Sequence, residues 1–205
     1  MHLELSRQLV HLSGVLFVIL AQYLGEIITV YFFIAAVFFL IYSEYVRVEQ
    51  KRINKVVDYM ESKIRGIATG MERKGAKRQF MGAFWFYMGC GLTFLIFPFH
   101  IATIACIILS VADAFSTLIG HKFGKVKMIG NKSLEGVLAF IISGVIAASL
   151  LTDFWTALAA VLIGTVAEMI PDISSLQKLK ENHLIDDNYL IPLLVGLFLY
   201  IQILI

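Results

Sequence analysis

Residues suited to phosphate chemistry are concentrated in one segment, residues 113–136. Four glycines and four lysines fall within 17 residues, and Asp113 and Glu135 lie near the ends of this segment. Glycine lets backbone amides approach phosphate oxygens closely, and lysines neutralise the phosphate charge. A polyphosphate bound with Mg²⁺ also needs a hard oxygen ligand such as Asp113. The segment therefore predicts a polyphosphate site, with an ordinary basic loop as the alternative.

The same segment does not match the P-loop of nucleotide hydrolases. One residue too many separates Gly124 from Gly130, and Asn131 separates Gly130 from Lys132 and Ser133. Asn131 or Ser133 can cap the helix that follows, and the positive end of that helix would then face the predicted polyphosphate site.

Several further ionisable residues lie inside apolar runs, where a central charge costs about 2.5–3.5 kcal/mol on insertion scales. A transporter would place such acids near the midplane beside helix breaks. Pro192 is the proline that lies deep enough in a span to form such a break, but it falls in the first turn of its helix, where proline is tolerated. The acids therefore favour a functional site at one end of the spans over a transport pathway through them. The structural alternative is that neighbouring lysines neutralise these acids at the membrane interface. The residues concerned are His11, Glu44, Asp113, Glu135 and Glu168, with Asp172, Asp186 and Asp187 at span ends.

These residues must be positioned by membrane helices. Of the 205 residues, 59% are hydrophobic and 16% charged, against about 45–50% and about 25% in soluble domains. A water-soluble globule is excluded, and the net charge of +2 gives no argument for nucleic acid. We predict an all-α, polytopic membrane protein with a single domain, residues 1–205, and about seven transmembrane helices. The predicted spans are Leu9–Leu24, Ile27–Val46, Phe80–Phe99, Ile101–Gly120, Leu134–Leu151, Phe154–Ile170 and Tyr189–Ile205.

The positive charges give the expected orientation. All 17 lysines and arginines fall on one side of the predicted spans, which marks the cytoplasmic side. The N-terminus is therefore predicted to be cytoplasmic and the C-terminus outside, with the acids at the cytoplasmic ends. The basic loop 47–79 has apolar residues at helical spacing, which suits an amphipathic helix on anionic headgroups or one packed on the other cytoplasmic loops.

The motifs of this chain resemble those of the CTP-dependent polyprenol kinase family, which includes dolichol kinases, phytol kinases and CTP-dependent diacylglycerol kinases. The start, Glu4 to His11, is similar to the family's N-terminal motif, although Gln8 replaces the usual lysine. The remaining matches are Asp113-Ala114, Gly120, Phe123-Gly124-Lys125, Lys132-Ser133-Leu134-Glu135-Gly136, the pair Glu44 and Arg47, Glu168, and Asp187-Asn188 with Pro192.

The resemblance implies Mg²⁺-dependent transfer of the γ-phosphate of CTP to a membrane lipid alcohol, with a polyprenol, dolichol or other isoprenoid alcohol favoured. Either Glu135 or His11 would accept the proton of the lipid hydroxyl. The implied catalytic residues are Asp113, Glu135, Lys132 and His11. The implied nucleotide-binding residues are Gly120, Lys122, Gly124, Lys125, Gly130, Asn131, Lys132, Ser133, Glu135 and Gly136. The implied metal ligands are Asp113, Glu168, Asp187 and Asn188, and Glu4, Arg7, Glu44 and Arg47 would support the site or its headgroup.

Two other functions remain open at the level of sequence. A cytidylyltransferase making a CDP-activated lipid would use the same cradle but attack the α-phosphorus, and its late Asp-Arg/Gln-x-Asp signature does not occur in this chain. A non-enzymatic lipid-binding protein is the second. The expected location is the cell membrane of a prokaryote or the endoplasmic reticulum of a eukaryote, with the site facing the cytoplasm.

Overall fold

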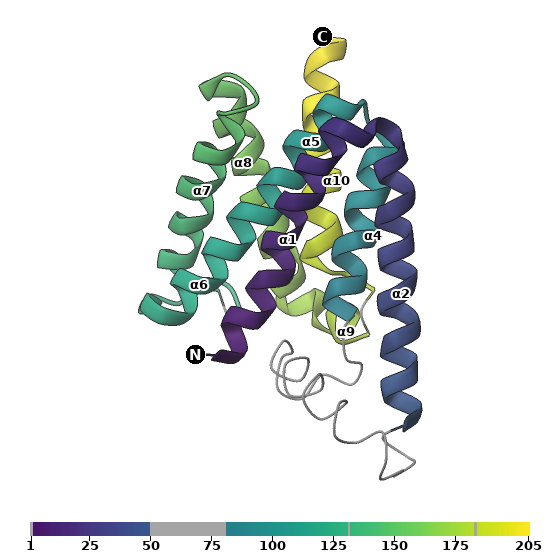
Figure 1. The fold of residues 1–205 in the computed structure, drawn as a ribbon. Coiled ribbons are helices and arrows are strands. Elements are labelled where there is room, and N and C mark those ends of the chain that lie inside the picture. Colours follow the sequence, from purple (N-terminus) through teal and green to yellow (C-terminus); the bar gives the residue numbers. More distant parts are fainter. Residues whose placement is uncertain (1, 50–80, 131, 183) are drawn as a thin grey trace.

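The computed structural model describes residues 2–49, 81–130, 132–182 and 184–205, and these residues form a bundle of helices (Figure 1). The predicted all-α class is thereby confirmed. The helices are α1 (His2–Leu24), η1 (Gly25–Ile27), α2 (Ile28–Glu49), α4 (Met81–Ile96), α5 (Phe99–Ile108), the π-helical turn η2 (Leu109–Asp113), α6 (Ala114–Phe123), α7 (Leu134–Ala148), α8 (Phe154–Met169), η3 (Ile170–Asp172), η4 (Ser174–Leu176), α9 (Gln177–Glu181) and α10 (Asp187–Leu204).

Each apolar run of the sequence coincides with a helix or with a continuous series of helices. Four helical segments among the described residues are long and apolar enough to cross a membrane, and α4 and α7 are shorter apolar helices. The first segment joins the second half of α1 to most of α2, and the chain reverses between them at η1, where Gly25 has a φ of +58°. The predicted count of about seven crossings stays a prediction. The four segments are Ser13–Tyr45, Phe99–Phe123, Phe154–Asp172 and Asp187–Leu204.

Helix α5 lies inside the bundle, and seven of its ten residues are buried. Around it, α2 packs along α4, α10 lies against α8 and α4, and α7 lies between α6 and α8. Large apolar side chains remain exposed on the outer helices, including Leu16, Ile34, Ile142, Val166 and Ile203. Such a large exposed apolar surface suits a protein surrounded by lipid.

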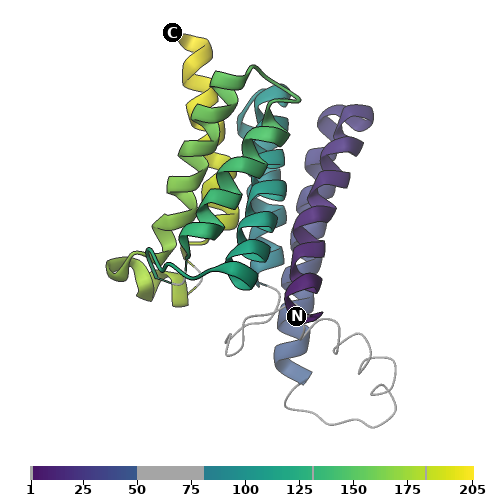
Figure 2. The same ribbon diagram turned by 90° about the vertical axis from the view of Figure 1, so that its left-hand side faces the viewer.

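The connections between helices gather at the two ends of the bundle (Figure 2). One end carries the start of α1, the last turn of α2, the α6–α7 connection and α9, whereas the opposite end carries η1 and the C-terminus. The described lysines and arginines belong to the first end. This division agrees with the predicted two-sided charge pattern, while the orientation in a membrane stays a prediction. Apart from residues 47–49, the predicted amphipathic helix of the 47–79 loop lies outside the described residues.

Candidate active site

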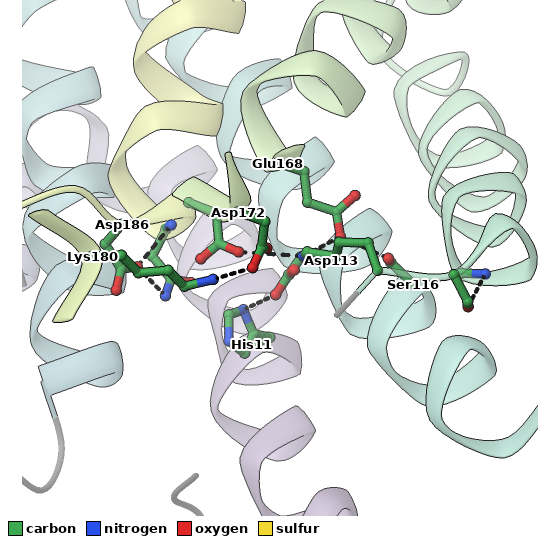
Figure 3. A network of polar contacts seen from close by, with 12 residues as sticks. His11, Asp113, Ser116, Glu168, Asp172, Lys180 and Asp186 are labelled. Atoms are coloured by element: carbon green, nitrogen blue, oxygen red, sulfur yellow. Dashed lines mark hydrogen bonds and ion pairs between the residues drawn. The ribbon is translucent and has the colours of Figure 1, made fainter. Parts of the chain in front are cut away.

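A buried cluster of polar side chains lies at the basic end of the bundle, although its members are far apart in the sequence (Figure 3). Each member comes from a different helix or connection, so the cluster exists only when the bundle is assembled. Its members are His11 of α1, Asp113 of η2, Ser116 of α6, Lys132 of the α6–α7 connection, Glu168 of α8 and Asp187 of α10.

The Lys132 ammonium joins two of the acids. Its Nζ lies 2.7 Å from Glu168 Oε1 and 3.4 Å from Asp187 Oδ2. Glu168 is fully buried, and its Oε1 also accepts a hydrogen bond of 2.7 Å from the Ser116 hydroxyl. Burial alone would lower the pKa of the Lys132 ammonium, but the carboxylates of Asp187, Glu168 and Asp113 outweigh this effect and raise the pKa above its ordinary value. The cluster therefore contains a charged lysine held between carboxylates.

Asp113 is placed by the π-helical turn. The widened turn of η2 ends at Asp113, inside an otherwise α-helical run from α5 to α6. Such turns frequently occur at functional sites, because the extra residue changes which side chains share a helix face. Asp113 Oδ2 lies 3.3 Å from His11 Nδ1, and both residues are buried. The imidazole also makes an edge contact with the Phe86 ring.

A glycine on α1 allows this contact. A Cβ on Gly14 would collide with the Phe86 ring and with the Ser110 hydroxyl of η2, so only glycine lets α1 approach so closely. Gly14 is three residues after His11, and residues at this spacing share a helix face. The close crossing therefore brings His11 within reach of Asp113.

A short hairpin, formed by residues 124–130 and 132–134, carries Lys132 into the cluster. Two backbone hydrogen bonds join the arms of the hairpin: Met128 N–H donates to Lys132 O (3.0 Å) and Leu134 N–H donates to Val126 O (2.8 Å). The Ser133 hydroxyl accepts from the Gly136 amide at 3.2 Å and caps α7, as one of the two sequence alternatives predicted.

The predicted phosphate-binding glycines have a packing role in this structure. A Cβ on Gly124 would lie 2.6 Å from Ser133 Oγ, and a Cβ on Gly136 would lie 3.0 Å from the carbonyl oxygen of Ser116. Gly120 lies directly against Gly136. Together these three glycines let α6, the hairpin and the first turn of α7 pack closely.

The other described residues that were predicted to bind the nucleotide lie outside the buried cluster. Lys122 and Lys125 are exposed at the end of α6 and in the hairpin. Both Glu135 carboxylate oxygens lie 3.4 Å from the Val126 amide, so Glu135 contacts the hairpin backbone. Asn131 lies outside the described residues.

The predicted metal ligands are brought to one region, but a complete metal site is not confirmed. No group of three or more histidine, cysteine, aspartate or glutamate side chains within the described ranges could hold a metal ion. Asn188 donates from its backbone and side-chain nitrogens to Asp186 Oδ1 at 3.0 and 2.7 Å. Glu168 Oε2 and Asn188 Oδ1 are buried and accept no hydrogen bond from the described residues.

Of the predicted supporting residues, Glu44 is half-buried in the last turns of α2. Glu4, Arg7 and Arg47 lie on the helical backbone of α1 and α2, and their side chains lie outside the described part of the chain. Ser116 and Gly14 were not among the residues predicted to form the site. An available signal was that Gly14 is the single glycine within the first predicted span.

The chain has a curated relative in Schizosaccharomyces pombe, the CTP-dependent diacylglycerol kinase 1. The two are 28% identical over 148 residues, which cover 63% of this chain and 63% of the relative. No protein-family model matches the chain, and no solved structure matches it. The relative confirms the resemblance to the CTP-dependent lipid kinase family that the 113–136 motif indicated.

Proposed function

We propose that this protein is a membrane-embedded, CTP-dependent lipid kinase, which transfers the γ-phosphate of CTP to the hydroxyl of a membrane lipid alcohol. The observation that carries the proposal is the buried Lys132–Glu168–Asp187 cluster, with His11 and Asp113 beside it, next to the glycine- and lysine-rich hairpin. The similarity to a CTP-dependent lipid kinase supports the same function.

The location of the cluster suits this reaction. A lipid hydroxyl lies at the membrane surface while its tail remains among apolar side chains, so a lipid kinase needs its polar site at one end of an apolar bundle. The cluster lies at the basic end, which also carries the α6–α7 connection, and Lys122 at the end of α6 and Lys125 after it are exposed. This end is proposed to face the cytoplasm, where CTP is present.

Phosphoryl transfer needs positioning and charge neutralisation more than covalent chemistry from the protein. We assign Lys132, Lys125 and the hairpin amides to the phosphates of CTP. In the transfer, the lipid oxygen loses its proton and bonds to the γ-phosphorus, while the bond to the β–γ bridging oxygen breaks and CDP leaves.

Of the two candidate proton acceptors, His11 is the better placed. It lies in the buried cluster, where Asp113 Oδ2 is 3.3 Å from its Nδ1 and can orient the ring. Glu135 instead lies at the first turn of α7, against the hairpin backbone. We therefore propose that His11 accepts the proton of the lipid hydroxyl, whereas Glu135 contacts the hairpin backbone.

The donor set fits magnesium bound together with the nucleotide. Mg²⁺ is usually held by one or two carboxylates plus substrate phosphates, so it does not require three acids of the protein. Glu168 has a buried oxygen, Oε2, that accepts no hydrogen bond from the described residues. Asp113, Glu168, Asp187 and Asn188 are the candidate ligands, and the ion would neutralise charge on the phosphates.

Two classes of acceptor are proposed. The resemblance of the motifs favours a polyprenol, dolichol or other isoprenoid alcohol, whereas the name of the S. pombe relative favours diacylglycerol. Purified protein in detergent, given γ-labelled CTP, Mg²⁺ and each lipid in turn, tests both. Label in one lipid class supports the kinase and identifies the acceptor. Folded protein that labels none of these lipids would contradict the proposal.

A further inference from the structure

The turn of the hairpin rests on a side chain outside the buried cluster. Gly130 has a φ of +56°, and a Cβ built on it would lie 2.9 Å from both Cβ and Oδ1 of Asp172. The backbone of the turn therefore contacts the Asp172 side chain directly. Glycine is required at this position both for the positive φ and for the close approach.

Asp172 is itself fixed by an ion pair. It ends η3, and its Oδ1 lies 2.7 Å from Nζ of Lys180 on α9 (Figure 3). The Asp172 side chain is 7% exposed and that of Lys180 is 20% exposed. A pair that is partly shielded from water in this way holds the Asp172 carboxylate in place, although partial burial removes some of its net stabilisation.

The hairpin therefore meets the continuous run of α8 and η3 at two points. Gly130 contacts Asp172, and two residues later Lys132 pairs with Glu168. Glu168 and Asp172 are four residues apart in a continuous helical run, so they lie about one turn from each other. Two contacts fix the position of the hairpin along this helical run better than one.

We propose that the Asp172–Lys180 pair positions the hairpin and thereby sets the placement of Lys132. The sequence marked Asp172 only as an acid at a span end and gave Lys180 no role, and neither residue is assigned to CTP or to the metal. The pair acts through the hairpin and is a positioning device. This inference rests on the proposed function for its effect on catalysis, but its structural effect can be measured without catalysis.

The test compares Asp172→Ala and Lys180→Ala with the wild-type protein and with Lys178→Ala. Lys178 is an exposed lysine on the same short helix, so its replacement controls for loss of charge from α9. Hydrogen exchange is followed in peptides covering residues 124–134, together with KM and kcat for CTP. Lys180→Arg serves as the conservative variant.

Both alanine variants should exchange hairpin amides about tenfold faster, because the support under Gly130 is lost. They should raise KM for CTP about tenfold with a smaller effect on kcat, since a displaced hairpin weakens phosphate contacts. Lys180→Arg and Lys178→Ala should behave like the wild-type protein.

The inference would be overturned if the hairpin amides of both alanine variants exchanged at the wild-type rate. Equal changes in Lys178→Ala would also overturn it, because the effect would then follow charge alone. If the wild-type protein transfers no phosphate, the proposed function fails, while faster hairpin exchange in the two variants still supports the positioning role. If Asp172→Ala loses its helical circular dichroism, the result for Lys180→Ala decides, because the Lys180 side chain is partly exposed and its loss leaves Asp172 in place.

Discussion

At the scale of single residues, the cluster depends on Lys132. Its side chain is only 16% exposed, and it neutralises Glu168 and Asp187, which belong to two different helices. Removal of one member of a buried ion pair leaves the other as an uncompensated charge, whereas replacement of both members by neutral groups is often tolerated. The stability and the activity of the protein can therefore be separated at this position.

The substitution Lys132→Ala should lower the free energy of unfolding by about 3–5 kcal/mol, because Glu168 then keeps a buried charge without its partner. Phosphate transfer should also be lost. Denaturant unfolding in detergent, followed by circular dichroism, measures the first effect, and transfer from γ-labelled CTP measures the second.

The double variant Lys132→Met with Glu168→Gln separates the two effects. A neutral glutamine keeps an oxygen that can accept from the Ser116 hydroxyl, so stability should recover toward that of the wild type. Activity should remain absent, because the charge assigned to the phosphates is missing. A double variant that is as unstable as Lys132→Ala, or one that transfers phosphate, would contradict this account of Lys132.

At the scale of the elements, the crossing of α1 over η2 brings His11 to Asp113. The contact depends on the missing side chain of Gly14, against which Phe86 and Ser110 are packed. A methyl group at this position must push the helices apart or displace the Phe86 ring.

The substitution Gly14→Ala should therefore cost about 1–3 kcal/mol of stability through overpacking and should reduce phosphate transfer by separating His11 from Asp113. Gly82→Ala is the matched control, because a Cβ on Gly82 meets its nearest heavy atom only at 4.0 Å. Thermal unfolding and transfer rates of the two variants are compared. Equal behaviour of the two variants would show that the crossing does not depend on Gly14.

The helices could be predicted from the sequence because the length of an apolar run decides whether it forms a long helix. The π-helical turn could not, since α5, η2 and α6 form one apolar run and the widened turn depends on packing around it. Ser116 was missed for a similar reason. Hydroxyls in apolar helices commonly bond to their own backbone, as those of Thr93 and Ser143 do in this protein, whereas Ser116 reaches Glu168.

The acids of the site were predicted as a set because a charge inside an apolar run is energetically costly and so indicates a function or an ion pair. Which group each one contacts was not predictable. Lys132 was predicted to bind phosphate, and its ammonium contacts Glu168 and Asp187 in this structure, so the phosphate role stays a prediction. Side-chain direction across helices far apart in sequence depends on the assembled bundle.

At the scale of the whole molecule, the polar site lies at one end of a bundle with an apolar exterior. The basic end should face the cytoplasm, because lysine-rich loops remain on that side of a membrane. In a background without Cys90 and Cys106, single cysteines at Lys127 and Ser149 should be labelled by an impermeant thiol reagent from opposite sides. Both positions are exposed, and they lie in the α6–α7 and α7–α8 connections. Labelling of both from the same side would contradict the orientation.

The central claim is that the γ-phosphate of CTP reaches a lipid hydroxyl. The most direct measurement gives the purified protein CTP labelled at either the γ- or the α-phosphate, with Mg²⁺ and, in separate reactions, a lipid alcohol or a lipid phosphate. We expect γ-label in the lipid alcohol and α-label in CDP. Appearance of α-label in the lipid, with release of pyrophosphate, would contradict it and establish a cytidylyltransferase.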